Sequence, residues 1–117
     1  MGSYIYIPIN DIPWSKWKDL GKHASNLVTM NPEDEVINCY VINEQSCDDE
    51  VVLFTKNGMV KRTNLSDYIV SRYTKLYTAI KLKDDDIVTN VEIKKDNTII
   101  VTKTGYYISY KTEEIPV

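Results

Sequence analysis

Long apolar runs and cysteines are both scarce in this chain of 117 residues. No segment approaches the ~18 to 20 apolar residues that a membrane-spanning helix needs, so we expect no membrane association. The N-terminus lacks a basic stretch followed by an apolar one, which excludes a typical signal peptide. The two cysteines, Cys39 and Cys47, fit neither a disulfide framework nor the spacing of a zinc site. We therefore interpret them as reduced thiols in a cytoplasmic protein.

Patterns typical of catalytic or metal sites are equally scarce. His23 is the only histidine, and no Ser, Cys or Asp motif supplies it with a catalytic triad. The run Asp84-Asp85-Asp86 lacks the spacing and the glycine of a calcium loop, and the acidic Glu33-Asp34-Glu35 aligns with it. Both runs are typical of polar turns. We predict that the chain carries no catalytic residue, no metal site and no cofactor.

What the chain does contain favours β-structure. It has nine Tyr and frequent Ile and Val, which are common in strands, whereas Gly and Pro are few. One segment, 14–27, has apolar residues at helical spacing, although Gly21 in its middle costs a helix roughly 1 kcal/mol relative to Ala. Alignment of this segment with residues 72–82 instead favours an extended connection that ends in a strand, and we prefer that interpretation over the helix.

The stretch 51–82 is the most informative part of the chain. Asn57-Gly58 lies between two strand-like runs and predicts a β-hairpin with a tight type I′ turn. The same stretch holds six Lys or Arg against one acid, a net charge of +5. Residues 1–50 carry −6 and residues 83–117 carry −2. A chain that is acidic overall therefore contains one strongly basic segment.

The sequence also repeats itself. Residues 51–64 align with 98–111 at a shift of 47, and residues 35–42 align with 86–93 at a shift of 51. The start of the chain, 2–7, resembles 105–110, as though it were the end of an earlier copy. Each unit of about fifty residues reads as strand, short loop, strand, Gly turn, strand, long polar connection and strand.

Such a unit has the length of one four-stranded antiparallel blade of a propeller-like fold. A single blade cannot bury both of its faces, so blades stack or close into rings. We therefore expect an all-β chain with about two blades. Residues 1–32 would form the end of one blade and a connection, 33–82 a full blade, and 83–117 part of the next.

Two sequence patterns resemble a known family. The pattern F-x-x-x-G-x-V-K-R-T occupies residues 54–63, and R-x-x-K-x-x-x-A-I-x-L occupies residues 72–82. Both resemble a blade of the C-terminal domain of bacterial type IIA topoisomerase A subunits. The segment 4–8 followed by 17–23 is most similar to the topoisomerase IV branch of Gram-positive bacteria. The gyrase-type box Q-R-R-G-G-K-G is absent, which also favours the topoisomerase IV branch.

The resemblance implies a β-pinwheel, a propeller-like ring whose basic outer rim binds and bends duplex DNA. It implies a part of an ATP-dependent DNA topoisomerase, an isomerase, that helps to capture or orient a DNA segment near the bacterial nucleoid. The implied partners are duplex DNA, the remaining blades and catalytic core of the A subunit, and the topoisomerase B subunit. The catalytic tyrosine and the ATPase would belong to other parts of that enzyme.

Cations on one surface are the physical requirement for DNA binding, because neutralised phosphates release counterions without any reading of sequence. Lys61 and Arg62 are consecutive in a strand and should point to opposite faces. We rank Lys81 below the other cations of 51–82, and the second repeat, with Ile108-Ser109 in place of Lys61-Arg62, as the weaker binder. The predicted DNA-binding residues are Lys56, Lys61, Arg62, Arg72 and Lys75.

Two alternatives remain open. A cationic hairpin can simply be a solvated surface that protects an edge strand from aggregation. The Tyr-rich strands could instead pack against another protein, which would make the chain an interaction module without direct DNA contact. Exposed strand edges could also support a homo-oligomer.

Overall fold

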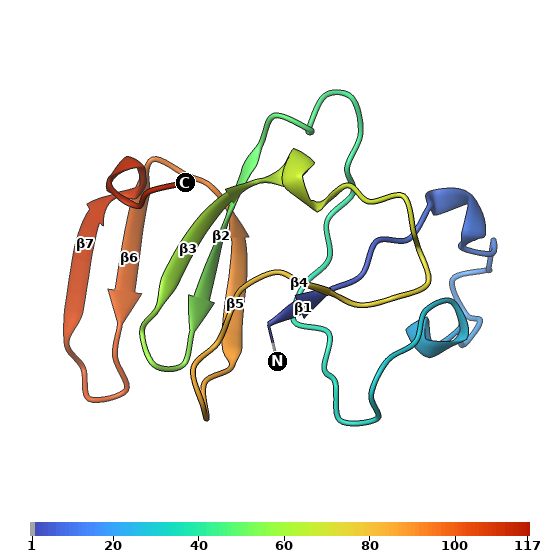
Figure 1. The fold of residues 1–117 in the computed structure, drawn as a ribbon, viewed down its shortest axis with the longest axis horizontal. Helices are drawn as coiled ribbons and strands as arrows, with labels where there is room; N and C mark the ends of the chain where they lie inside the picture. The colour runs from blue at the N-terminus through green and yellow to red at the C-terminus, as the bar shows by residue number, and fades with distance from the viewer. Residues whose placement is uncertain (1) are drawn as a thin grey trace.

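The structure is a computed structural model that describes residues 2–117, and its regular elements are strands and short 3-10 helices (Figure 1). The strands are β1 (Ser3–Tyr4), β2 (Glu50–Thr55), β3 (Val60–Asn64), β4 (Tyr77–Thr78), β5 (Val88–Ile93), β6 (Asn97–Val101) and β7 (Tyr107–Lys111). The 3-10 helices are η1 (Ile9–Asp11), η2 (Ala24–Asn26), η3 (Leu65–Tyr68) and η4 (Thr112–Glu114). All strand pairs are antiparallel, which confirms the predicted all-β class.

The predicted hairpin at Asn57-Gly58 forms, but its turn type differs from the prediction. Gly58 has φ of +85°, whereas Asn57 is not in the positive-φ region that a type I′ turn demands. The Gly58 N–H donates to the Thr55 carbonyl and the Thr55 N–H donates to the Met59 carbonyl. The loop is therefore one residue longer, a type I turn followed by a left-handed glycine. This alternative satisfies the strand twist with only one positive φ.

The predicted repeat is confirmed in the second hairpin, β6–β7. Gly105 has φ of +91°, its N–H donates to the Thr102 carbonyl, and the Thr102 N–H donates to the Tyr106 carbonyl. These bonds reproduce those of the first turn at the shift of 47 residues. A 3-10 helix follows the hairpin in both copies, η3 after β3 and η4 after β7. Helix η1 occupies the matching place after the N-terminal segment, as expected for the end of an earlier copy.

The sheets differ from the expected four-stranded blade. The largest sheet has the order β3-β2-β5, and the other two sheets, β1-β4 and β6-β7, have two strands each. Strand β5 lies in the segment that we assigned to the next blade, so the sheet crosses the expected boundary between residues 82 and 83. The expected strand at 35–42 forms no ladder with any described strand. Periodicity gives the length of a repeat, but not the point at which one blade begins.

Side chains, rather than a fourth strand, occupy the outer edge of β5. The Val91 carbonyl accepts hydrogen bonds from Asn38 Nδ2 at 2.9 Å and from Tyr40 Oη at 2.6 Å. The Val91 N–H donates to the Asn90 side chain at 2.9 Å. These contacts hold the segment around Asn38 and Tyr40 beside the sheet and satisfy edge groups that would otherwise be open to pairing.

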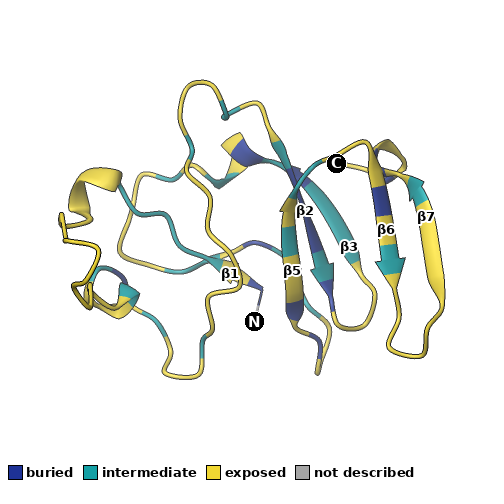
Figure 2. Ribbon diagram, turned by 180° about the vertical axis from the view of Figure 1, so that it is seen from behind, coloured by how far each residue is buried: buried dark blue, intermediate teal, exposed yellow. Residues whose placement is uncertain are grey.

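The core lies on the face of the β3-β2-β5 sheet that is turned towards the N-terminal segment (Figure 2). Val51 and Leu53 of β2 are 2% and 4% exposed and pack with Leu65 of η3 and with Ala79. The opposite face of the sheet is turned towards the β6–β7 hairpin. The first hairpin is therefore packed on both faces, as a blade within a stack should be.

The segment 14–27 contains no α-helix, which agrees with the preferred extended interpretation. It does not end in a strand, however, because η2 (Ala24–Asn26) forms there, with His23 Nδ1 accepting from the Ser25 N–H. Trp14, Trp17 and Leu20 are almost fully exposed, so the helical spacing had no partner surface to select a helix. No helix among residues 2–117 has the length and apolar character to cross a membrane.

Candidate nucleic-acid interface

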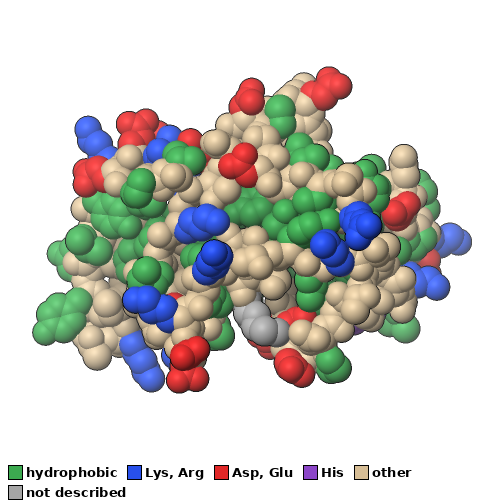
Figure 3. Space-filling view, viewed as in Figure 1, with side chains coloured by type: hydrophobic (Ala, Val, Ile, Leu, Met, Phe, Trp, Pro, Cys, Tyr) green, Lys and Arg blue, Asp and Glu red, His purple; other side chains and the backbone are tan. Residues whose placement is uncertain are grey.

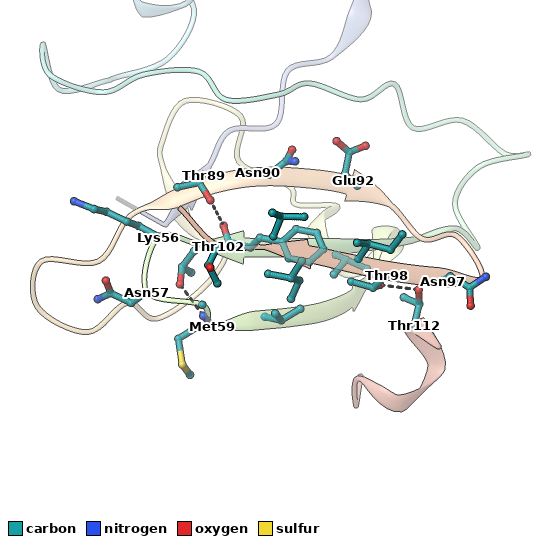
Figure 4. Close-up of a pocket in the computed structure, with 18 of the residues that line it drawn as sticks. Lys56, Asn57, Met59, Thr89, Asn90, Glu92, Asn97, Thr98, Thr102 and Thr112 are labelled. Carbon is teal, nitrogen blue, oxygen red and sulfur yellow. Dashed lines mark hydrogen bonds between the residues drawn. The ribbon is translucent and has the colours of Figure 1, made fainter. Parts of the chain in front are cut away.

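Three of the five predicted DNA-binding cations have exposed side chains, and the turn residue Lys56 is the first. It occupies the tip of the β2–β3 hairpin at one end of a cleft (Figure 4). The glycine at position 58 lets the chain reverse there. Figure 4 shows the Lys56 side chain pointing away from the strands. The ammonium group is therefore available to a phosphate.

Asp86 fixes this turn, a role that the sequence analysis missed. Its Oδ1 atom accepts the Asn57 N–H at 3.0 Å and the Ile87 N–H at 2.9 Å. Burial alone would raise the pKa of Asp86, but hydrogen bonds from the Thr55 hydroxyl and these two N–H groups, and then the charge of Lys56, outweigh burial and lower the pKa. The carboxylate thus anchors the tip of one hairpin to the start of β5. The predicted polar turn at 84–86 is confirmed, with Asp85 at φ of +63°.

Arg72 and Lys75 form the second exposed group, on the connection between η3 and β4. The Tyr77 hydroxyl donates to the Arg72 carbonyl at 3.0 Å, and Lys75 Nζ lies 5.0 Å from the centre of the Tyr77 ring. Tyr77 itself is held by stacking on Tyr4 at 5.6 Å. Tyr77 therefore contacts both Arg72 and Lys75 within one short loop. Neither cation forms an ion pair with a described residue.

Lys61 lies in a different environment, because it is partly buried on the core face of β3. Its ammonium group donates to the Ala79 carbonyl at 2.6 Å. Ala79 is 6% exposed, so this bond supplies a donor to a carbonyl that water reaches poorly. The alternation of the strand places Lys61 and Arg62 on opposite faces, as predicted, but neither face is a free outer surface.

Arg62 lies at the junction between the two hairpins, and its side chain is only 12% exposed. Its Nη1 atom donates to the Thr112 carbonyl of η4 at 3.3 Å, and its Nε atom lies 3.6 Å from Glu50 Oε2. Lys94 Nζ lies 3.1 Å from the same carboxylate oxygen and 3.7 Å from Glu113. The guanidinium is thus one member of a small charge network that joins successive repeats.

A cleft of about 740 Å³ separates the β3-β2-β5 sheet from the β6–β7 hairpin (Figure 4). Apolar side chains line its centre, and the buried hydrogen bond between Thr98 and Thr112, at 2.8 Å, closes one end. Both turn lysines, Lys56 and Lys103, line it as well. Figure 1 shows the two hairpin turns at the same end of the molecule. Each hairpin turn therefore places one lysine at this end of the molecule. The alignment of residues 55–58 with 102–105 already pairs these two lysines.

Charges of both signs are spread over the face of the molecule seen in Figure 3, and the Lys and Arg side chains do not merge there into one continuous patch. The structure therefore does not place the five predicted cations along one arc. Arg72 and Lys75 share one loop, Lys61 and Arg62 are partly buried, and Lys56 lines the cleft together with Lys103, which was not among the predicted residues. Among residues 2–117, no group of three or more His, Cys, Asp or Glu side chains is placed to hold a metal ion.

Comparison with known proteins identifies relatives of the whole chain. The sequence model of a family described as the DNA gyrase C-terminal domain, a β-propeller, matches residues 2–43 and again 49–93. The second match contains all three strands of the β3-β2-β5 sheet. Two successive matches agree with the repeat found in the sequence.

Among curated proteins, the chain is 36% identical to the A subunit of DNA topoisomerase 4 from Bacillus subtilis (strain 168) and 33% identical to that from Staphylococcus epidermidis. The alignments cover 99% and 97% of this chain, but only 15% and 14% of those relatives. A crystal structure of the C-terminal domain of DNA topoisomerase IV superposes with a TM-score of 0.91 at 35% identity. That comparison covers 98% of this chain and 36% of the other.

Proposed function

The chain belongs to the DNA gyrase C-terminal domain family of β-propellers, and from this premise we propose that it binds duplex DNA without sequence specificity. It would do so as part of the A subunit of a topoisomerase IV, where it would help to capture, orient and bend a DNA segment. The single observation that carries the proposal is that three of the predicted DNA-binding cations, Lys56, Arg72 and Lys75, are exposed. The ion pairs among residues 2–117 involve Arg62 and Lys94 instead, which leaves these three charges free for phosphates.

The structure changes the weight given to each predicted residue. Lys61 and Arg62 donate hydrogen bonds to the Ala79 and Thr112 carbonyls. They can contact DNA only if these hydrogen bonds break. A charged donor that leaves a poorly solvated carbonyl costs free energy, so the exposed cations are the better candidates. Lys103, at the equivalent turn position of the second hairpin, joins them.

The number of free cations sets the expected salt dependence. Three phosphates, neutralised by Lys56, Arg72 and Lys75, give a slope of about −2.7 in log affinity against log salt, so affinity should fall roughly 40-fold between 50 and 200 mM salt. A fourth contact, by Lys103, would make the slope steeper. With an overall charge of −3, the chain alone should bind weakly.

The test is duplex DNA binding by fluorescence anisotropy at several salt concentrations. The variant Lys56→Glu/Arg72→Glu/Lys75→Glu removes the three exposed cations that we predict to contact DNA. The matched control, Lys16→Glu/Lys18→Glu/Lys22→Glu, makes the same change in net charge on an exposed loop of the N-terminal segment. We expect the first variant to lose binding and the control to retain most of it. Equal losses would show that only net charge matters, and a folded wild-type chain that does not bind at low salt would reject the proposal.

The alternative function, a protein interaction module built on the tyrosines, has less support. Tyr4 packs against Tyr68 at 4.8 Å, and Tyr6 stacks on Tyr73 at 5.5 Å, so these rings already have partners within the chain. An apolar tyrosine interface would respond little to salt, which distinguishes it from phosphate binding in the same assay.

The role of the whole protein follows as a wider proposal. The chain spans about 15% of its curated relatives, whose names describe the A subunit of a topoisomerase. We infer that this segment performs no chemistry itself, and that in the cytoplasm it acts on DNA together with the rest of an A subunit and with a B subunit. The ATP-dependent change of DNA topology would belong to that assembly.

A further inference from the structure

Asp86 is the only charged residue among residues 2–117 that is buried, with 7% of its surface exposed. It forms no ion pair with a described residue, so hydrogen bonds must offset the cost of removing its carboxylate from water. Its neighbours Asp84 and Asp85 are both exposed. The burial is therefore specific to position 86 and is not a property of the acidic run.

The first hairpin turn is bonded at three consecutive residues to the segment that leads into β5. The Thr55 hydroxyl donates to the Asp86 carboxylate, and the Asn57 N–H donates to Asp86 Oδ1 at 3.0 Å. Between them, the Lys56 N–H donates to the Ile87 carbonyl at 2.9 Å. The Ile87 N–H also donates to Asp86 Oδ1 at 2.9 Å, which fixes the carboxylate. The backbone of Lys56 is therefore held from both sides.

A β-bulge at the start of β5 makes these contacts possible. Phe54 lies opposite Asn90, but Thr55 lies opposite Val88, so Thr89 is an extra residue on β5. The Thr89 hydroxyl donates to the Phe54 carbonyl at 3.4 Å (Figure 4). The extra residue shifts the segment before β5 by one position along the hairpin, and bulges commonly redirect side chains in this way. The carboxylate reaches the turn because of strand pairing, and not because of local sequence.

Building on the DNA binding proposed above, we propose that Asp86 is a positioning residue that sets the affinity for DNA through Lys56. The Lys56 side chain is exposed and points away from the strands (Figure 4). In a mobile turn, ordering this side chain and its backbone on a phosphate would cost conformational entropy. The three bonds to the turn fix the backbone from which the side chain extends, so less freedom is lost on binding.

Position and charge predict opposite effects for this residue. A carboxylate close to a DNA-binding lysine repels phosphates, so removal of its charge alone should strengthen DNA binding. If Asp86 instead positions Lys56, loss of its hydrogen bonds should weaken DNA binding even though a negative charge has been removed. The sign of the change in affinity therefore distinguishes the two effects.

Three variants of the 117-residue chain separate charge from position. Asp86→Ala removes both the charge and the acceptor. Asp86→Asn removes the charge and keeps an oxygen that can accept the two N–H groups. Asp86→Glu keeps the charge but moves the carboxylate by one methylene in a closely packed site. Fluorescence anisotropy measures the binding of duplex DNA, and calorimetry of the same samples checks that each variant is folded.

One phosphate contact contributes roughly tenfold to affinity at about 50–100 mM salt. We expect Asp86→Ala and Asp86→Glu to bind DNA roughly three- to tenfold more weakly than wild type, and Asp86→Asn to stay within about twofold of it. The slope of log affinity against log salt should become shallower by up to about 0.9 in Asp86→Ala. A purely structural role would lower Tm without changing the salt slope of the folded chain.

A double-mutant cycle tests whether Asp86 acts through Lys56. In a Lys56→Met background, Asp86→Ala should not weaken DNA binding further. Lys75→Met is the matched control, because it removes one exposed cation from a different loop. In that background Asp86→Ala should retain its full effect.

Equal losses from Asp86→Ala in the two backgrounds would overturn the positioning role and leave DNA binding itself established. Tighter binding by both Asp86→Ala and Asp86→Asn would overturn it as well. If Asp86→Ala does not fold, Asp86→Glu in the same two backgrounds decides the question. A folded wild-type chain that does not bind duplex DNA at low salt would instead reject the proposed function, and the positioning role with it.

Discussion

Replacing Arg62 by methionine separates the two roles that a cation in the basic stretch can have. Methionine retains most of the apolar stem, and it removes the guanidinium that donates to the Thr112 carbonyl and lies 3.6 Å from Glu50. If the structural role dominates, the variant should lose stability and its remaining folded fraction should bind DNA almost normally. If Arg62 instead acts on DNA, affinity should fall and stability should not.

The magnitude follows from the surroundings of Arg62. A hydrogen bond to a charged group contributes about 1.5–3 kcal/mol. The lower part of this range applies, because Glu50 keeps Lys94 at 3.1 Å and is not left without a partner. We expect a loss of about 1.5–2 kcal/mol in the free energy of unfolding. For a chain of this length that corresponds to a decrease in Tm of about 6–8 °C.

The assay is differential scanning calorimetry, with DNA binding of the same samples measured below the transition. Tryptophan fluorescence would be a poor probe, because Trp14 and Trp17 are already exposed in the folded chain. Lys56→Met is the matched control, since it removes an exposed cation of the same hairpin. It should weaken DNA binding and leave Tm within about 2 °C. An Arg62→Met variant with unchanged Tm and with the DNA-binding defect of Lys56→Met would refute the reasoning.

Four further substitutions test other parts of the structure. Lys61→Met should cost about 1.5 kcal/mol in urea unfolding, because the buried Ala79 carbonyl loses its donor; no loss would mean that water replaces the ammonium. Gly58→Ala and Gly105→Ala should each cost about 1–2 kcal/mol through backbone strain alone, since no atom lies within 4 Å of the added carbon; equal losses at both turns would support their equivalence, and a neutral change at either would contradict it. Asp86, whose pKa is lowered on folding, stabilises the chain above its unfolded value of 3.8 and loses that contribution as the pH falls through the lower folded value. An acid titration should therefore show the wild-type chain and Asp86→Asn converging in stability below pH 3.8, and a constant difference would exclude this role.

Local signals in the sequence predicted the hairpins well. Asn57-Gly58 fixed the position of the first turn, and the shift of 47 residues carried the prediction to Gly105, whose hydrogen bonds match those of Gly58. The type of turn was wrong because Asn-Gly is compatible with more than one loop. The choice depends on the neighbouring Thr55, whose side-chain oxygen accepts the Met59 N–H. Local sequence gives the turn, and the bonds around it give the geometry.

The pairing of strands could not be read in the same way. Segment 35–42 and segment 86–93 have the same apolar pattern, yet only the second joins the sheet. The reason is the order of the chain, because β5 follows the β2–β3 hairpin and returns to its edge, whereas 35–42 precedes it. A pattern of apolar residues indicates a strand, but it does not say which hairpin the strand completes.

The two consecutive cations of the V-K-R-T pattern show the same limit for function. Lys61 and Arg62 are the most conspicuous basic pair in the chain, and each donates to a carbonyl of a neighbouring element. The second repeat has Ile108 and Ser109 at these positions, which by sequence alone suggests a weaker DNA-binding surface. These two positions, however, are packing positions in the first hairpin, while both turns carry an exposed lysine. If the turns are the parts that contact phosphates, the absence of a Lys-Arg pair from the second repeat changes how that repeat packs against the next one. The contribution of its turn lysine to DNA binding is then unaffected.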